Sequence, residues 1–304
     1  MHRFIIDYGV KEKTLDIENY KFLIGDNYKE KFKIFETIRS CFNKVPNSEF
    51  AIENNLKHKM FFDEKPLDPK QWRYFELTPF FDVETDIKLG TKSLMGKYLD
   101  SFANDLEQNE IFNTLQILIN SLNDEFFDKE TCINLGDKEF KLQLSDVNRT
   151  TISKEIIGHI IHNNFECNSS DLSYEEIILL QLKIIDVIAS KNNDKLMFVY
   201  CNFPYLTSEI KTYITGMKYE NLFILIDTLH ISNISISDIA VSSKHYIDFT
   251  NEEVLLDVMM DFPFHISLES LLEKCQNSIL TNCYNPKDSL IIEIFPWEIY
   301  SKNS

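Results

Sequence analysis

Short apolar runs separated by amphipathic segments define the expected architecture of this chain. The runs at residues 20–24, 195–200 and 222–226 are continuous, which is typical of parallel strands covered on both faces of a sheet. Two further runs lie at residues 245–249 and 290–295. Segments with helical spacing separate most of these strands, so the pattern predicts an α/β body.

The first strand is expected between a hairpin and a long helix. Residues 1–18 predict a hairpin that turns near Gly9. After the strand at 20–24, Gly25 and Asn27 supply a sharp turn, because both tolerate left-handed backbone. Apolar residues then recur at three- and four-residue spacing, which predicts an amphipathic helix. Its expected apolar face consists of Phe32, Phe35, Ile38 and Phe42.

The middle of the chain changes from irregular to helical. Residues 43–89 are interpreted as strands and loops that decorate the α/β body, and the composition changes at about Gly90. Helical stripes at 94–106 and 111–126 predict two long helices. An extended piece is expected at 139–144, where apolar and polar residues alternate.

Another pair of helices is expected before the chain returns to the sheet. The first opens near Thr151 or Ser153 and carries Ile160 and Ile161 on its apolar face. Residues 163–173 are polar and predict a loop. Ser173 opens an S-x-x-E capping box, which predicts the start of the second helix.

These patterns divide the chain into a head and an inserted leg. Residues 1–90 are expected to form the first part of an α/β head, and residues 91–190 a helical leg. Residues 191–304 should then form the second part of the head. A helix at 206–217, opened by Thr207 or Ser208, is expected within that second part.

Gly25 and Lys31 stand in the register of a phosphate-binding P-loop, which has the form G-x-x-x-x-G-K-[ST]. Glu30 replaces the second glycine, and its carboxylate would lie beside a triphosphate. Phe32 replaces the hydroxyl residue that ligates Mg²⁺. The expected fold class is therefore α/β, with a degenerate P-loop-like parallel-sheet head domain and an inserted helical arm. A strand, turn and helix without a ligand is the plainer interpretation of the same residues.

The second half of a phosphate site is altered as well. In P-loop enzymes a neighbouring strand ends in an aspartate that supports Mg²⁺. The strand at 195–200 ends instead in Cys201 and Asn202, and Asp227 ends the next strand with Thr228 after it. With both halves altered, the sequence predicts no catalytic residue and no ATP hydrolysis.

One group of residues has metal-ligand chemistry. His159 and His162 would share a helix face at a spacing of three, with Glu166 and Cys167 close behind. Their apolar neighbours and the lack of a second ligand cluster favour a structural or surface role. The sequence therefore leaves the metal ligands unknown.

Charge and composition restrict the partners. The chain has 304 residues and a formal net charge of −17, so it should repel nucleic acid and anionic membranes as a whole. Basic patches at 57–59 and 70–73 are interpreted as solvated surface, with contact to a DNA backbone as the alternative. Six cysteines without a C-x-x-C pair and no apolar run of 18 residues predict a reduced, cytoplasmic protein without a membrane segment.

Residues 195–228 carry a family resemblance. A basic residue, an apolar strand, Asn202, a helix opened at Tyr205 to Thr207, and the strand at 222–226 follow in that order. This arrangement resembles the accessory spacer-acquisition protein of type II-A CRISPR systems, the second member of the Csn family. The N-terminal strand, the helical arm and the return to the sheet agree with it. Segments 43–89 and 260–304 would make this chain a longer variant.

The resemblance implies a specific assembly. Members of that family are degenerate P-loop folds that form homotetramers around double-stranded DNA, with lysines facing the hole and calcium stabilising the ring. They act with the CRISPR integrase and effector nuclease complex. Lys92 and Lys97, at the start of the arm, are candidate DNA contacts by position. The family's calcium-binding run corresponds here to 144–149, where Asp146 is the remaining carboxylate.

Three functions follow as hypotheses. The first is a non-catalytic ring protein that binds double-stranded DNA during spacer acquisition in antiviral defence. The second is a P-loop-type nucleotide-dependent enzyme with a non-standard loop, using Lys31 on phosphate and Asp227 on Mg²⁺. The third is an acidic interaction scaffold without a ligand of its own.

Overall fold

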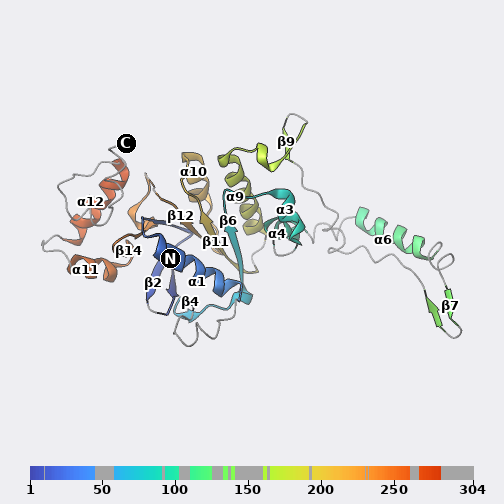
Figure 1. The fold of residues 1–304 in the computed structure, drawn as a ribbon, viewed down its shortest axis with the longest axis horizontal. Coiled ribbons are helices and arrows are strands. Elements are labelled where there is room, and N and C mark those ends of the chain that lie inside the picture. Colours follow the sequence, from blue (N-terminus) through green and yellow to red (C-terminus); the bar gives the residue numbers. More distant parts are fainter. Residues whose placement is uncertain are drawn as a thin grey trace. The chain divides into compact units, whose positions relative to one another are not determined.

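The computed structural model describes residues 1–9, 11–44, 58–90, 93–102, 110–124, 133–135, 138–140, 160–162, 165–191, 194–229, 231, 233–260 and 267–281. The chain divides into two compact units, traced in Figure 1. The first contains Met1–Pro79 and Asn193–Ser304, and the second contains Phe80–Asn192. The expected boundaries between head and leg are residues 90 and 190.

A six-stranded sheet forms the centre of the first unit. Its strand order is β14-β13-β3-β12-β11-β6, and every neighbouring pair from β13 to β6 is parallel. The strands are β3 (Tyr20–Ile24), β6 (Trp72–Leu77), β11 (Leu196–Asn202), β12 (Leu222–Asp227), β13 (Ile239–Ser242) and β14 (Tyr246–Asp248). The expected α/β class and the three apolar strands β3, β11 and β12 are thereby confirmed.

The sheet differs from the prediction in three places. The run at 245–249 is not a parallel strand, because β14 pairs antiparallel with β13 at the edge. The strand β13 is not predicted, since its four residues include Ala and Ser and form no apolar run. The patch at 70–73 is not simply solvated surface, because Trp72 opens β6 and is buried. The expected strand at 290–295 lies outside the described residues.

A smaller antiparallel sheet in the first unit has the order β2-β1-β4-β5. It consists of β1 (His2–Asp7), β2 (Glu12–Ile17), β4 (Lys59–Phe62) and β5 (Lys65–Pro66). The register of β1 against β2 pairs His2 with Ile17 and Asp7 with Glu12. The predicted hairpin at residues 1–18 is therefore confirmed.

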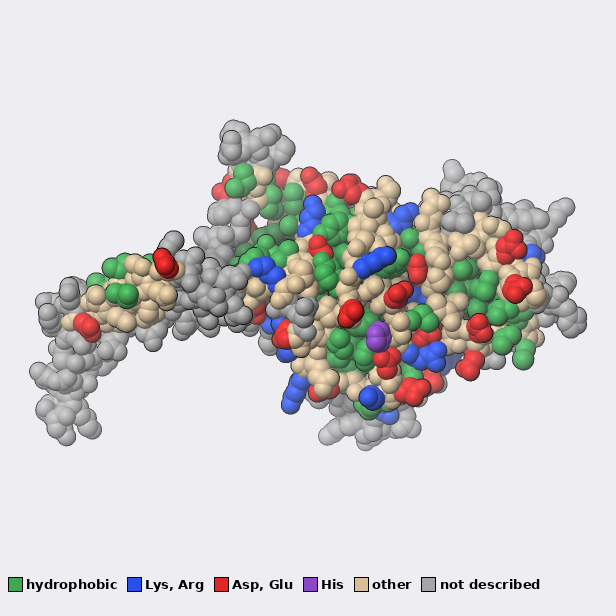
Figure 2. Space-filling model, turned by 180° about the vertical axis from the view of Figure 1, so that it is seen from behind, with side chains coloured by type: hydrophobic (Ala, Val, Ile, Leu, Met, Phe, Trp, Pro, Cys, Tyr) green, Lys and Arg blue, Asp and Glu red, His purple; other side chains and the backbone are tan. Residues whose placement is uncertain are grey.

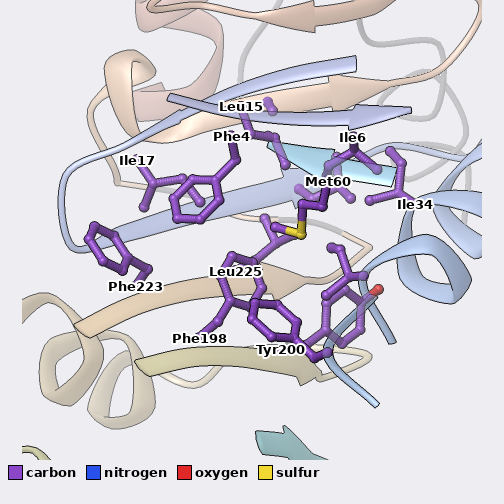
Figure 3. Packing of buried hydrophobic residues seen from close by; sticks show 14 of the residues in the cluster. Phe4, Ile6, Leu15, Ile17, Ile34, Met60, Phe198, Tyr200, Phe223 and Leu225 are labelled. Carbon is purple, nitrogen blue, oxygen red and sulfur yellow. The ribbon is translucent and has the colours of Figure 1, made fainter. Parts of the chain in front are cut away.

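The core of the first unit lies between these two sheets (Figure 3). Phe4 and Leu15 point from the smaller sheet toward Phe198 and Phe223 on the larger one. The Phe4 ring lies 5.2 Å from the Phe198 ring and 5.3 Å from the Phe223 ring, both edge to face. Each such side chain contributes roughly 1.5–3 kcal/mol through burial. This packing fixes β11 and β12, whose ends carry the site described below.

Helix α1 (Tyr28–Phe42) also contributes to this core: Ile38 and Phe42 of the expected apolar face are buried in it, and Phe35 packs against it. Phe32 is 61% exposed, so the apolar stripe predicted through Phe32 is wrong at that residue. The helix is rotated so that Lys31 is buried and reaches an acidic partner on β12. Its buried residues are Lys31, Ile34, Thr37, Ile38 and Phe42.

Within the part of the first unit that the structure describes, three further helices are present. They are α10 (Ser208–Gly216), α11 (Glu252–Met260) and α12 (Leu268–Thr281). Thr207 caps α10 by accepting a hydrogen bond from the backbone N–H of Ile210, which confirms the predicted helix start. No helix within the described ranges is both long and apolar enough to cross a bilayer.

The described residues of the second unit form helices and two short antiparallel strand pairs. Its helices are α3 (Val83–Lys88), α4 (Leu94–Asp100), α6 (Glu110–Leu122) and α9 (Tyr174–Lys191), and its strands are β7 (Ile133–Leu135), β8 (Lys138–Phe140), β9 (Ile160–His162) and β10 (Phe165–Cys167). Ser173 and Glu176 form the predicted capping box, because the Glu176 carboxylate accepts from the backbone N–H of Ser173 and the Ser173 hydroxyl accepts from the backbone N–H of Glu176.

The helix predicted across Ile160 and Ile161 is wrong at those residues. They belong to β9, which pairs antiparallel with β10. Short runs of isoleucine fit a strand as well as a helix, so periodicity alone does not separate the two. The loop predicted at 163–173 is wrong in part for the same reason, since it contains β10 and the 3₁₀ turn Ser169–Asp171.

Candidate functional site

The polar residues of the site lie at the carboxyl ends of neighbouring parallel strands. Asn202 ends β11 and stands opposite Asp227, which ends β12. Asp227 is also paired in register with Leu23 of β3. The chain leaves β3 through a turn and enters α1, where Lys31 lies one turn into the helix. Ligands of open α/β sheets bind at this edge.

Lys31 and Asp227 form a buried ion pair. The Lys31 Nζ lies 2.7 Å from Asp227 Oδ1 and donates a second hydrogen bond to the Thr228 carbonyl at 2.8 Å. Tyr200 donates its hydroxyl to Asp227 Oδ2 at 2.8 Å. Both oxygens of the carboxylate therefore have partners, and the Lys31 side chain is only 3% exposed.

Burial dominates the electrostatics of this cluster. It lowers the pKa of Lys31, and the attraction of Asp227 offsets part of that effect. Burial also raises the pKa of Tyr200 well above its ordinary value, with the neighbouring Asp227 acting in the same direction. Tyr200 is consequently a neutral donor to the carboxylate rather than an acid or base near pH 7.

The turn before α1 is too short to enclose a phosphate. It consists of Gly25, Asp26 and Asn27, and the helix begins at Tyr28. Gly25 has a φ of +114°, and a Cβ there would lie 2.1 Å from the Ser242 carbonyl oxygen. The glycine is thus required by the close approach of β13. Residues that would form the phosphate loop in the P-loop register are helical here.

Three of the first four backbone N–H groups of α1 have acceptors within the turn. The backbone N–H of Tyr28 donates to the Asp26 carbonyl at 2.9 Å. The Glu30 N–H donates to the side chain and carbonyl of Asn27, and the Lys31 N–H donates to the same carbonyl. Free N–H groups at a helix start are what a phosphate requires. The cap supplied by Asn27 uses these donors.

Glu30 connects α1 to two strands. Its Oε1 accepts from the Tyr8 hydroxyl at 3.0 Å and lies 3.1 Å from Lys13 Nζ, while its Oε2 accepts from the Ser242 hydroxyl at 3.1 Å. Burial acts to raise the pKa of Glu30, but Lys13 and the hydrogen bonds outweigh it, so the pKa is lowered. Glu30, which stands where the P-loop pattern has its second glycine, therefore has a structural role: it joins α1 to β2 and β13. No local pattern in the chain indicates these partners.

A cavity of about 250 Å³ opens beside the ion pair. Tyr28, Phe32 and Phe35 of α1 line one part of it, and Asn202 and Thr228 line another. The Thr228 hydroxyl is buried and has no hydrogen-bond partner among the residues that can be described. Sequence reasoning identifies Asp227 and Asn202 as strand ends but does not find this cavity, because it depends on how α1 is rotated.

The remaining site predictions are only partly within the described chain. Lys97 lies in α4 of the second unit, 3.4 Å from Asp100 Oδ2, and is 32% exposed. Lys92 lies outside the described residues. Gly25 and Lys31 are brought together in one turn and helix of the first unit, as the sequence indicates. Contact of Lys92 and Lys97 with DNA stays a prediction.

No metal cluster is present in the ranges that the structure covers, since no group of three or more His, Cys, Asp or Glu side chains is placed to hold an ion. His162 lies in β9 rather than on a helix, so the shared helix face expected with His159 is wrong. His159 and the segment 144–149 lie outside the described residues. Calcium therefore stays a prediction from the resemblance.

Charges of both signs are interspersed on the face shown in Figure 2. Lysine and arginine side chains alternate there with aspartate and glutamate over the described residues. Three arginines pair with carboxylates within the first unit: Arg3 with Asp16, Arg39 with Glu76, and Arg73 with Asp194.

Comparison with known proteins shows a likeness of fold to solved structures. No family model matches the sequence. No curated protein matches it either. The fold is similar to the crystal structure of Stu0660 of Streptococcus thermophilus, with a TM-score of 0.64 and 15% sequence identity. The likeness covers 96% of this chain and 92% of that chain. At this level of identity it establishes a shared fold.

Proposed function

We propose that this chain is a non-catalytic protein that binds double-stranded DNA as a homotetrameric ring and takes part in CRISPR spacer acquisition. The observation that carries the non-catalytic part is the buried pair between Lys31 and Asp227. The DNA-binding part rests on the family resemblance of residues 195–228. The fold likeness extends over nearly all of both chains, which supports a relationship broader than a single shared domain.

The closed pair supports a loss of nucleotide chemistry. A P-loop lysine must reach the phosphates, yet Lys31 is bound to Asp227 and the Thr228 carbonyl. An aspartate that supports Mg²⁺ must offer a free oxygen, yet both oxygens of Asp227 have partners. A nucleotide would have to break this cluster before binding. We infer that the cluster stabilises the fold instead.

The charge distribution supports backbone contact by lysines rather than base readout. Arginine is the main residue for bidentate recognition of guanine, and Arg3, Arg39 and Arg73 are already paired with carboxylates. A net charge of −17 opposes DNA binding by the exposed surface at large. A ring would present only its inner surface to the phosphates, so a small set of lysines would suffice there.

The resemblance also supplies the proposed partners. The chain would act with the CRISPR integrase and effector nuclease complex, and calcium is the proposed ion of the assembled ring. The experiment that tests this proposal is the measurement of solution mass by light scattering, with and without linear duplex DNA and Ca²⁺. A tetramer that retains linear duplex is expected. A monomer that ignores duplex DNA under every combination would support the acidic interaction scaffold instead.

A P-loop-type nucleotide-dependent enzyme is the second candidate, favoured by the direct juxtaposition of Lys31 and Asp227 at the strand ends. In that case ATP and Mg²⁺ would open the pair. Isothermal titration with ATP and Mg²⁺ separates the two candidates. We expect no heat of binding, because Lys31 is paired with Asp227 and Asn27 caps the start of α1.

A further inference from the structure

The cavity beside the ion pair is not used by the proposed DNA-binding function. Its volume of about 250 Å³ lies just below the usual range of roughly 300–1,000 Å³ for sites that hold drug-sized ligands. It therefore suits a single ring system better than a whole nucleotide. The lining comes from α1 and from the ends of β11 and β12, so it rests on rigid elements of one unit.

The wall formed by α1 is aromatic and exposed. Tyr28 and Phe32 lie four residues apart on the helix and are 62% and 61% exposed. Phe35 lies deeper, and its ring centroid is 4.9 Å from that of Tyr200. Two large aromatic side chains beside a cavity form a platform on which a flat ring can stack.

The polar part of the cavity is neutral. Lys31 and Asp227 neutralise each other, so no unpaired charge in the lining attracts a phosphate or a carboxylate. The Asn202 side-chain amide is exposed and has no hydrogen bond to any described residue. Thr228 adds a hydroxyl that is buried without a partner in the described part of the chain. An amide offers a donor and an acceptor side by side, which matches the edge of a nucleobase.

We propose that this cavity binds a nucleobase and does not recognise the phosphates of a nucleotide. The base stacks on Phe32 and Tyr28, and the Asn202 amide hydrogen-bonds to its edge. This combination of aromatic stacking with edge recognition is how proteins hold unstacked bases. The base comes either from a free nucleoside or from an unpaired end of a DNA strand, because the same chemistry would recognise both.

Saturation-transfer NMR titrations with adenosine, cytidine, ATP and a single-stranded tetranucleotide of deoxyadenosine test this proposal. We expect adenosine or cytidine to bind, and ATP to bind no more tightly than adenosine. Phe32→Ala should weaken binding by roughly tenfold or more, as the loss of one base–aromatic stack predicts. Asn202→Ala should weaken binding and reduce the difference between the two nucleosides. Phe80→Ala, which removes a 93% exposed aromatic residue of the second unit, is the matched control.

The source of the base follows from the same titrations. Tighter binding of the tetranucleotide than of adenosine, lost in Phe32→Ala, would identify a strand end as the source. Binding of nucleosides alone would identify the free compound. No binding of either nucleoside or of the tetranucleotide at millimolar concentration would overturn the proposal. So would equal affinity of wild type and Phe32→Ala, or an affinity for ATP more than about tenfold above that for adenosine.

Duplex binding is measured on the same variants. The ring proposal requires salt-sensitive duplex binding that Phe32→Ala leaves unchanged, because Phe32 lies in the cavity and not among the proposed lysine contacts. Failure of duplex binding would therefore contradict the ring proposal without affecting the nucleobase proposal, and the reverse also holds.

Discussion

Lys21 Nζ lies 2.5 Å from Asp248 Oδ1, and both side chains are almost completely buried within the six-stranded sheet. Lys21 also donates to the Ser237 carbonyl at 2.8 Å and to the Thr250 hydroxyl at 3.1 Å. Asp248 Oδ2 accepts from the backbone N–H of Asp16 at 2.8 Å. This pair connects both sheets of the first unit, and none of its residues lines the cavity beside Lys31.

Removal of one member of this pair should destabilise the fold strongly. Lys21→Met leaves the Asp248 carboxylate buried without its counter-ion, so we expect a loss of about 3–5 kcal/mol in the free energy of unfolding. Urea denaturation followed by circular dichroism measures it. Lys11→Met, at an exposed lysine in the same unit, should change stability by less than about 0.5 kcal/mol. If Lys21→Met lowers the free energy of unfolding by less than about 1 kcal/mol, the ion pair contributes little to the stability of the fold.

Lys31 and Asp227 should behave as a coupled structural pair. Lys31→Met or Asp227→Asn alone should each destabilise by about 2 kcal/mol, because each leaves a buried charge without its counter-ion. The double variant should lose less than the sum of the two, by about 0.5–3 kcal/mol as is typical of interacting residues. Urea unfolding of wild type and the three variants gives this coupling energy. Additive losses would argue that the pairing does not stabilise the protein.

Gly25 and Gly216 should respond to alanine with opposite signs. Gly25→Ala places a Cβ 2.1 Å from the Ser242 carbonyl oxygen at a φ of +114°, so we expect a loss of about 2 kcal/mol or more. Gly216, at the end of α10, has open space at its Cβ position. Gly216→Ala should therefore gain about 0.5 kcal/mol. Thermal unfolding of both variants measures these shifts, and a neutral Gly25→Ala would contradict the close approach of β13.

Because of Glu30, the free energy of unfolding should decrease at acidic pH. Its pKa in the fold is below the ordinary value of 4.5, so its contribution is fully present above pH 4.5 and is lost as the pH falls through the folded pKa. Glu30→Gln should cost about 2 kcal/mol at neutral pH, because it weakens charge-assisted hydrogen bonds, and less as the pH is lowered. Urea unfolding between neutral pH and about pH 3 measures the difference from wild type.

A control separates this effect from a general loss of negative charge. Glu12→Gln removes the same charge from an exposed position and should give a small difference at every pH. If the difference in free energy of unfolding between Glu30→Gln and wild type stays constant across the whole pH range, the ionised form of Glu30 does not contribute the stabilisation.

Lys92 and Lys97 should contribute to duplex binding if they face the DNA. Removing one lysine–phosphate interaction should reduce the slope of log affinity against log salt by about 0.9. Lys92→Gln with Lys97→Gln is therefore expected to lower the slope by about 1.8. Fluorescence anisotropy with a labelled duplex measures it. Lys218→Gln, at an exposed lysine of the first unit outside both basic patches, should leave the slope unchanged. An unchanged slope in the double variant would exclude both lysines.

The sequence is informative where local chemistry decides the conformation. The apolar runs of β3, β11 and β12 are excluded from water, so their burial is predictable. The Asn27 to Tyr28 start of α1 and the capping box at Ser173 depend on neighbouring residues only. Asp227 is identified as a strand end because an apolar run stops there.

Contacts between distant segments decide the rest. Periodicity places Phe32 in the core, but the ion pair with Asp227, 196 residues away, turns Lys31 inward and leaves Phe32 beside the cavity. The strand β13 is not visible in the sequence, because its burial comes from pairing with β3 rather than from an apolar run. Glu30 is expected only to repel a phosphate, while its actual partners include residues of β2 and β13.

By itself the sequence determined the α/β class, the main strands and the helix caps, since each of these follows from residues close together in the chain. Only the tertiary structure determined that Lys31 forms an ion pair with Asp227 and that a neutral cavity with aromatic side chains lies beside the pair. The rotation of one helix against a sheet is set by long-range packing and ion pairing, and no local pattern encodes it.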